Sequence, residues 1–291
     1  MKYLLALSII LSGCSAIQKK EEEAPRVTPP HLVGWSYECH KLESVEGGSY
    51  CIHTKGTPKY TIPYFHGLGC NQDVLQDPTG VCKVLPGMKK KDGSSERALM
   101  TALDNVTVVT VSFGEAWMMD PFPPKLQADK DATTKNFAEK IFPEIERRHP
   151  GRLPKPWKAV GHSMGGHNLV TLAMSYPEMF SLVALIRPMI VTCDPWQAVV
   201  GLKCVGGILF IGAEFPREKW LKATPLARIK KERLPLTFVD VCWDDEFGLV
   251  DGPKEFAMTG MGRGLQVYLR ETTAGCTHSE FDAPWVLQVM E

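Results

Sequence analysis

Short apolar runs separated by glycine, proline and charged residues make up most of the chain after residue 31. Runs of four to eight apolar or β-branched residues are typical of buried strands. They occur here at residues 60–65, 157–160, 207–211, 236–241 and 266–270. The apolar run NLVTLAMSY at residues 168–176 predicts a helix that ends before Pro177. We see no composition shift that would divide residues 31–291 into two domains.

An earlier apolar run lies at the amino terminus, from Tyr3 to Leu11. It is shorter than the ~20 apolar residues that a membrane-spanning helix needs, so it predicts a secretory signal peptide over residues 1–13. The tetrad LSGC, which ends at Cys14, resembles the bacterial lipobox, whose cysteine receives a diacylglycerol and becomes the first mature residue. A plain secretion signal with an incidental cysteine is the alternative interpretation.

The segment after the signal peptide predicts a lipid-anchored, flexible tether over residues 14–30, because it is polar, charged and rich in proline. Lipid on Cys14 would hold the protein to a membrane surface in the bacterial cell envelope without spanning it. Ser15 and Ala16 follow Cys14, and neither is an aspartate of the kind that retains some lipoproteins at the inner membrane, which favours the outer membrane.

The charged residues balance, with 33 Lys plus Arg against 33 Asp plus Glu. Binding to nucleic acid requires a surplus or clustering of basic residues. We therefore expect no nucleic-acid partner. The sequence leaves the oligomeric state open.

Nine cysteines are present, and assigning Cys14 to the lipid leaves eight. An even number in an exported chain predicts disulfides. The simplest proposal pairs neighbours in sequence: Cys39 with Cys51 across a hairpin, Cys70 with Cys82, Cys193 with Cys204, and Cys242 with Cys276. Zinc is the competing interpretation, but the sequence shows no CxxC motif or histidine-rich cluster at metal-ligand spacing. We expect no metal.

The motif G-x-S-x-G, formed by Gly161, Ser163 and Gly165, is the main chemical signal. Between a strand and a helix, such a motif places the serine on a sharp turn with its hydroxyl exposed. An upstream turn at His66-Gly67 follows the strand at residues 60–65. The backbone N–H groups of Leu68 and Met164 would then form an oxyanion hole.

His278 lies after the last predicted strand, where a general base is expected. The other histidines precede the first core strand, flank the serine, belong to the upstream turn or lie on a predicted surface helix: His31, His40, His53, His66, His149, His162 and His167. For the acid we rank Asp245 first, Asp244 second and Glu214 third. Asp240 is expected to lie inside its strand, where a buried carboxylate needs a partner.

These residues resemble the α/β-hydrolase superfamily, and more narrowly the esterase D-like group of esterases. The resemblance is clear over GHSMGGHNLVTLAMSYPEMFSLVALIRP, at Asp245-Glu246-Phe247, and at His278 and Trp285. It implies an α/β-hydrolase fold with a mostly parallel central sheet and helices on both faces. The segment from Pro188 to Leu234 is longer than a minimal connection and is a candidate lid or substrate wall.

The resemblance implies acyl-ester chemistry. Ser163 would attack a small-molecule or polymer-linked ester, His278 would act as base and Asp245 would orient it, without a metal or an organic cofactor. A lipase or a serine peptidase remains open, because G-x-S-x-G does not specify the scissile bond. A catalytically silent binding lipoprotein is a further alternative.

Overall fold

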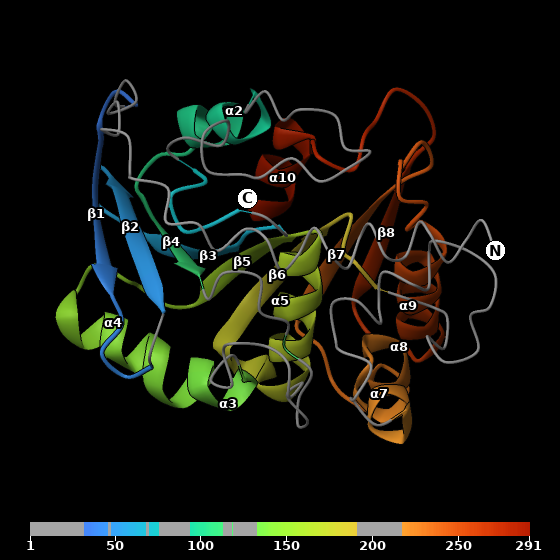
Figure 1. Ribbon diagram of the computed structural model, residues 1–291. Helices are drawn as coiled ribbons and strands as arrows, with labels where there is room; N and C mark the ends of the chain where they lie inside the picture. The colour runs from blue at the N-terminus through green and yellow to red at the C-terminus, as the bar shows by residue number, and fades with distance from the viewer. Residues whose placement is uncertain are drawn as a thin grey trace, which may run out of the picture. The chain divides into compact units, whose positions relative to one another are not determined.

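Eight strands of the described chain form one sheet, in the order β1-β2-β4-β3-β5-β6-β7-β8 (Figure 1). The computed structural model describes residues 32–45, 48–67, 70–75, 94–112, 118, 133–190 and 217–291. The strands are β1 Trp35–Lys41, β2 Ser49–Lys55, β3 Tyr60–Phe65, β4 Val106–Ser112, β5 Trp157–His162, β6 Phe180–Ile186, β7 Leu236–Cys242 and β8 Val267–Thr272.

Strands β3 to β8 run parallel to one another, whereas β1 and β2 form an antiparallel hairpin at one edge of the sheet, and β2 also pairs with β4 antiparallel. The predicted Cys39–Cys51 disulfide is present in this hairpin. The two cysteines lie directly opposite each other in the register, with their Cα atoms 4.0 Å apart. The bond therefore covalently fixes the register of the edge strand.

Helices cover both faces of the sheet (Figure 1). They are α2 Ser94–Ala102, α3 Thr134–Asn136, the π-helical turn η1 Phe137–Ile141, α4 Phe142–Arg148, α5 Met164–Ser175, the 3-10 turn η2 Pro177–Met179, α7 Arg217–Ala223, α8 Pro225–Arg228, α9 Asp251–Gly262 and α10 Ala283–Met290.

The two faces of the sheet belong to two separate apolar clusters. On one face, Leu99 of α2 and Val286 of α10 pack with the strands. On the other face, Ile145 of α4, Leu172 of α5 and Phe256 of α9 pack with them. Because both faces are buried, the central strand β4 is buried along its whole length. The predicted fold class is confirmed.

The predicted strands match the structure to within two residues at each end where the structure describes them. The predicted helix at residues 168–176 is real but begins earlier, because α5 starts at Met164, directly after Ser163. The predicted strand at residues 207–211 lies outside the described residues. So do the signal peptide, the tether and Cys14, which stay predictions, whereas Leu32–Glu291 forms one compact unit.

In the described part of the chain, no helix combines the length and apolar character that crossing a membrane requires.

Candidate active site

Ser163 occupies a strained turn between β5 and α5. Its backbone has φ 54° and ψ −119°, a conformation that residues with a side chain rarely adopt. The surrounding backbone holds it there. The Ser163 N–H donates to the carbonyl of Ile186 at 3.0 Å, and the Ser163 carbonyl accepts from Met189 at 2.9 Å. The turn is therefore fixed by the neighbouring strand β6 and by the segment after it.

The glycines of the motif are required by contact with backbone. A Cβ atom at Gly165 would lie 2.1 Å from the carbonyl oxygen of Phe65, at the end of β3. At Gly161 it would lie 2.6 Å from the carbonyl oxygen of Gly165. Both distances are far below van der Waals contact. The helix can therefore begin directly at the strand ends only because these positions lack side chains.

Ser163, His278 and Asp245 form one chain of hydrogen bonds. The Ser163 hydroxyl lies 2.7 Å from Nε2 of His278, and Nδ1 of His278 lies 2.6 Å from Oδ2 of Asp245. An ionised carboxylate only accepts hydrogen bonds, so Nδ1 carries the proton and Nε2 accepts from the serine. The structure thus brings together the three residues that ranked first in the sequence.

The environment of Asp245 favours its ionised form. Burial alone would raise its pKa, but the hydrogen bond and attraction to His278, together with the backbone N–H groups of Phe247 and Leu249, lower the pKa below its ordinary value. The Phe247 N–H donates to Oδ1 at 2.8 Å. Asp245 therefore stays a carboxylate while it holds the imidazole.

Asp244, the second-ranked acid, is not in this chain of hydrogen bonds. Its Oδ2 accepts from the backbone N–H of Gly275, at an exposed position. Asp240 lies inside β7, as expected, and is almost fully buried beside Arg187 and Arg270. Burial raises the pKa of Asp240 to about 6 against the opposing effect of the two guanidinium groups. Glu214 lies outside the described residues.

Two further side chains hold the backbone of His278, a role that was not predicted for them. The His278 N–H donates to Oε2 of Glu246 at 2.6 Å, and the His278 carbonyl accepts from Nε2 of His162 at 2.8 Å. Both contacts join residues more than thirty positions apart through main-chain atoms. No local motif indicates such contacts, so only the folded structure reveals them.

The predicted Cys242–Cys276 disulfide is present next to these residues. Its Cα atoms lie 5.9 Å apart, and it joins the end of β7 to the loop that carries His278. Cys70 is also disulfide-bonded. Its predicted partner Cys82, and the predicted pair Cys193–Cys204, lie outside the described residues.

The predicted oxyanion turn lies against the serine. A Cβ atom built on Gly67 would be 3.4 Å from Cβ of Ser163, so the end of β3 and the nucleophile turn are in contact. Met164 is the first residue of α5 and is buried. Leu68, the other predicted donor, lies outside the described residues.

One histidine prediction is wrong. His149 was expected on a solvated helix surface, but its side chain is buried after α4 and contacts Tyr50 and Glu38. Of the charged residues before it, Arg148 forms an ion pair with Glu43 in the β1–β2 turn, and Glu144 accepts from the backbone N–H groups of Glu43 and Ser44. His167 is buried on α5, where burial lowers its pKa to about 4 and its ring contacts the carbonyl of Met118 at 3.2 Å.

The sheet order, the strand-turn-helix at Ser163, and the positions of Asp245 and His278 later in the chain define an α/β hydrolase. The S-formylglutathione hydrolase of Agrobacterium tumefaciens is similar with a TM-score of 0.58 and 17% identity, over 91% of this chain and 95% of that one. A ferulic acid esterase gives a TM-score of 0.56 and 15% identity, over 88% and 95%.

The acylaminoacyl peptidase of Pyrococcus horikoshii has a TM-score of 0.59 and 15% identity, over 85% of this chain but 38% of that one. At such identities these likenesses show the fold alone, and esterases share it with a peptidase. No curated protein has a sequence that matches this chain.

A family model described as "Putative esterase" matches residues 83–288, which is most of the chain. The protein therefore belongs to this esterase family and is a hydrolase that acts on esters.

Replacing Gly165 by alanine tests the packing at the turn. We expect Gly165→Ala to lower the free energy of unfolding by about 3 kcal/mol or more, because the new methyl group overlaps the backbone of β3. Gly262→Ala in α9 is the matched control. No atom of the described residues lies within 4 Å of its Cβ position, so stability should hold or rise by about 0.5 kcal/mol. Equal denaturation midpoints for the two variants would contradict this packing argument.

Proposed function

We propose that the protein is a serine esterase that hydrolyses carboxylic esters through a covalent acyl-enzyme. The observation that carries the proposal is the continuous chain of hydrogen bonds from the Ser163 hydroxyl through His278 to Asp245. A serine hydroxyl is a weak nucleophile on its own, and an adjacent oriented base is what activates it. Membership of the esterase family supports the ester bond as the one that is cleaved.

In the proposed reaction, Ser163 Oγ attacks the ester carbonyl carbon while its proton moves to Nε2 of His278. The tetrahedral intermediate collapses when the carbon–oxygen bond to the alcohol breaks and His278 returns the proton to the departing oxygen. Water then attacks the acyl-serine, again giving its proton to His278, and the acid product leaves as Ser163 is restored. The substrate carbonyl and water supply all the atoms, so the steps need no cofactor.

Asp245 has two tasks in this mechanism. It keeps the proton of the neutral imidazole on Nδ1, which leaves Nε2 free to accept, and it stabilises the imidazolium that forms during attack. The buried, hydrogen-bonded carboxylate is suited to both, because it is already ionised and fixed in place.

The backbone N–H groups of Met164 and Leu68 are our proposed oxyanion hole. The support is the position of Met164 at the start of α5 and the contact of the Gly67 turn with Ser163. Donors fixed in the backbone need no rearrangement when negative charge develops on the carbonyl oxygen. A helix start adds the favourable end of its dipole to the same place.

We further propose that the enzyme acts outside the cytoplasm, held to the bacterial envelope by lipid on Cys14. The sequence of residues 1–14 suggests this location. The disulfides at Cys39–Cys51 and Cys242–Cys276 fit an oxidising compartment, since such bonds persist mainly outside the cytosol. Substrates would then be small or polymer-linked esters that reach the membrane surface.

The choice of acid is tested with a pair of adjacent variants. Asp245→Asn should lower kcat/KM for a p-nitrophenyl ester by about 10³- to 10⁴-fold, because the imidazole loses its orienting carboxylate. Asp244→Asn, which alters an exposed side chain one residue away, should change it by no more than about twofold. Equal losses, or a larger loss at Asp244, would overturn the assignment.

Turnover of matched amides but not of esters would favour a serine peptidase over an esterase.

The Cys242–Cys276 disulfide should matter for activity as well as stability. Chain entropy predicts a loss of about 4 kcal/mol for the Cys242→Ser, Cys276→Ser variant and about 3 kcal/mol for the matched Cys39→Ser, Cys51→Ser variant. Only the first bond holds the loop of His278, so only the first variant should lose kcat/KM, by about 10- to 100-fold in the folded protein. Undiminished turnover in both would show that the bond is purely structural.

The anchor is tested by substituting Cys14. Wild-type protein made in a bacterial host should enter the membrane fraction and incorporate an alkyne-tagged fatty acid, whereas Cys14→Ala should do neither. Ser15→Ala is the control and should behave as wild type. Fatty-acid incorporation that persists in Cys14→Ala would mean that another residue carries the lipid, and no incorporation in wild type would leave a plain secretion signal.

A further inference from the structure

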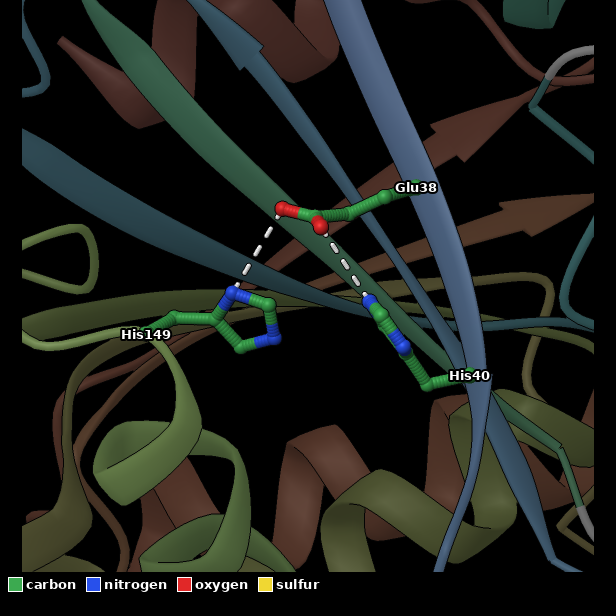
Figure 2. A group of neighbouring side chains, drawn as sticks. All are labelled: Glu38, His40 and His149. Carbon is green, nitrogen blue, oxygen red and sulfur yellow. Dashed lines mark hydrogen bonds and ion pairs between the residues drawn. The ribbon is translucent and has the colours of Figure 1, made fainter.

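Three side chains with metal-binding groups converge at the edge of the sheet that is remote from Ser163. Glu38 and His40 lie two residues apart on β1 and so share one face of the strand. His149 follows α4, more than a hundred residues later. Figure 2 shows both imidazole rings turned toward the Glu38 carboxylate. One ligand atom from each residue lies within 4.8 Å of the other two.

We propose that Glu38, His40 and His149 bind one zinc ion. Two histidines with one carboxylate form a common zinc donor set, with bonds of about 2.0–2.2 Å. In a tetrahedral site these bond lengths place neighbouring donor atoms about 3.3–3.5 Å apart. Nε2 of His40 lies 3.2 Å from Oε2 of Glu38, and Nδ1 of His149 lies 3.5 Å from Oε1. The two histidines face different oxygens of Glu38, and one ligand atom from each residue lies within 4.8 Å of the others, so binding through a single oxygen needs side-chain rotations. Water would complete the site.

The partner of His149 supports this assignment. Nε2 of His149 lies 3.1 Å from the hydroxyl of Tyr50, which is fully buried in β2. Histidines that bind metals commonly donate their second ring N–H to an oxygen, which fixes the tautomer and the ring orientation. Here that hydrogen bond leaves Nδ1, the atom that faces Glu38, to bind the ion. His40 packs against the rings of both Tyr50 and His149, with centroids 5.3 Å and 5.4 Å away.

Arg152 competes for the same carboxylate. Its guanidinium forms an ion pair with Oε1 of Glu38 and donates to Thr54 Oγ1 at 2.9 Å. The other oxygen, Oε2, faces His40. An ion bound through Oε2 would leave Arg152 on Oε1, at the cost of bringing zinc close to a guanidinium. Arg152 should therefore weaken zinc binding without blocking it.

The position of the site argues for a structural rather than a catalytic ion. From β1 to β5 the sheet order crosses four strand spacings of about 4.8 Å, so the site lies about 19 Å across the sheet from the strand before Ser163. Bound zinc would join the edge strand β1 to the end of α4, two elements far apart in sequence. Zinc binding at this edge does not depend on the proposed esterase mechanism.

The test is calorimetric titration of ZnCl₂ into the full mature chain with its disulfides intact. EDTA treatment first removes any bound metal from the protein. The protein carries His278→Ala, so that the imidazole beside Ser163 does not compete for the ion. We expect one zinc per chain, and a titration with Co²⁺ should give the intense visible absorption of a tetrahedral ion. Absence of a 1:1 zinc isotherm, or the weak absorption of an octahedral cobalt ion, would overturn the proposal.

Variants assign the ligands. His40→Ala and Glu38→Gln should each weaken zinc binding by at least about tenfold. Glu43→Gln is the matched control, because Glu43 is an exposed carboxylate near the same end of α4 and should leave binding unchanged. Wild-type affinity in His40→Ala, or an equal loss in Glu43→Gln, would contradict the site.

Arg152→Gln gives a test in the opposite direction. Removing the competing guanidinium should tighten zinc binding several-fold, an effect that destabilisation of the fold would not produce. Zinc at about a hundred times its Kd should also raise the Tm of the His278→Ala parent protein by roughly 5 °C. It should leave the Tm of the His40→Ala variant unchanged. Weaker binding in Arg152→Gln, or an equal Tm rise in His40→Ala, would also overturn the proposal.

Discussion

The close approach of the Ser163 turn to the end of β3 is the constraint on which the active site depends. Because Gly165 lies against the carbonyls of Phe65 and His66, α5 begins directly at the strand ends. That geometry forces Ser163 into a strained backbone conformation. Hydrogen bonds to Ile186 and Met189 hold it there, so the strain is balanced by contacts with the neighbouring strand. The hydrogen bond between the Ser163 hydroxyl and Nε2 of His278 depends on this fixed position of the serine.

The acid and base reach Ser163 from loops, which are the less rigid parts of a fold, and the structure fixes them with several independent contacts. Asp245 is held by backbone N–H groups, and His278 is held at its N–H by Glu246 and at its carbonyl by His162. The disulfide from Cys242 to Cys276 joins the two loops covalently. Together these contacts place the imidazole within hydrogen-bond distance of both partners before any substrate binds, which is what efficient proton transfer requires.

Sequence reasoning succeeded where the chemistry is encoded locally. The glycines around Ser163, the strand before Asp245 and the loop of His278 each have a signature in neighbouring residues, and these three positions meet in the fold. It failed where a role depends on contacts between distant segments. His149 was misplaced because its charged neighbours suggested a solvated helix, whereas packing against Tyr50 buries it. The grouping of His149 with Glu38 and His40 was invisible for the same reason, since no spacing in the chain indicates it.

Covalent trapping shows directly whether Ser163 is the nucleophile. A fluorophosphonate probe is added to the disulfide-bonded protein, and the labelled peptide is then identified by mass spectrometry. We predict one adduct on Ser163, lost in Ser163→Ala and formed much more slowly in His278→Ala, because the base activates the hydroxyl. An unlabelled wild type, or an adduct that persists in Ser163→Ala, would show that Ser163 is not the activated nucleophile.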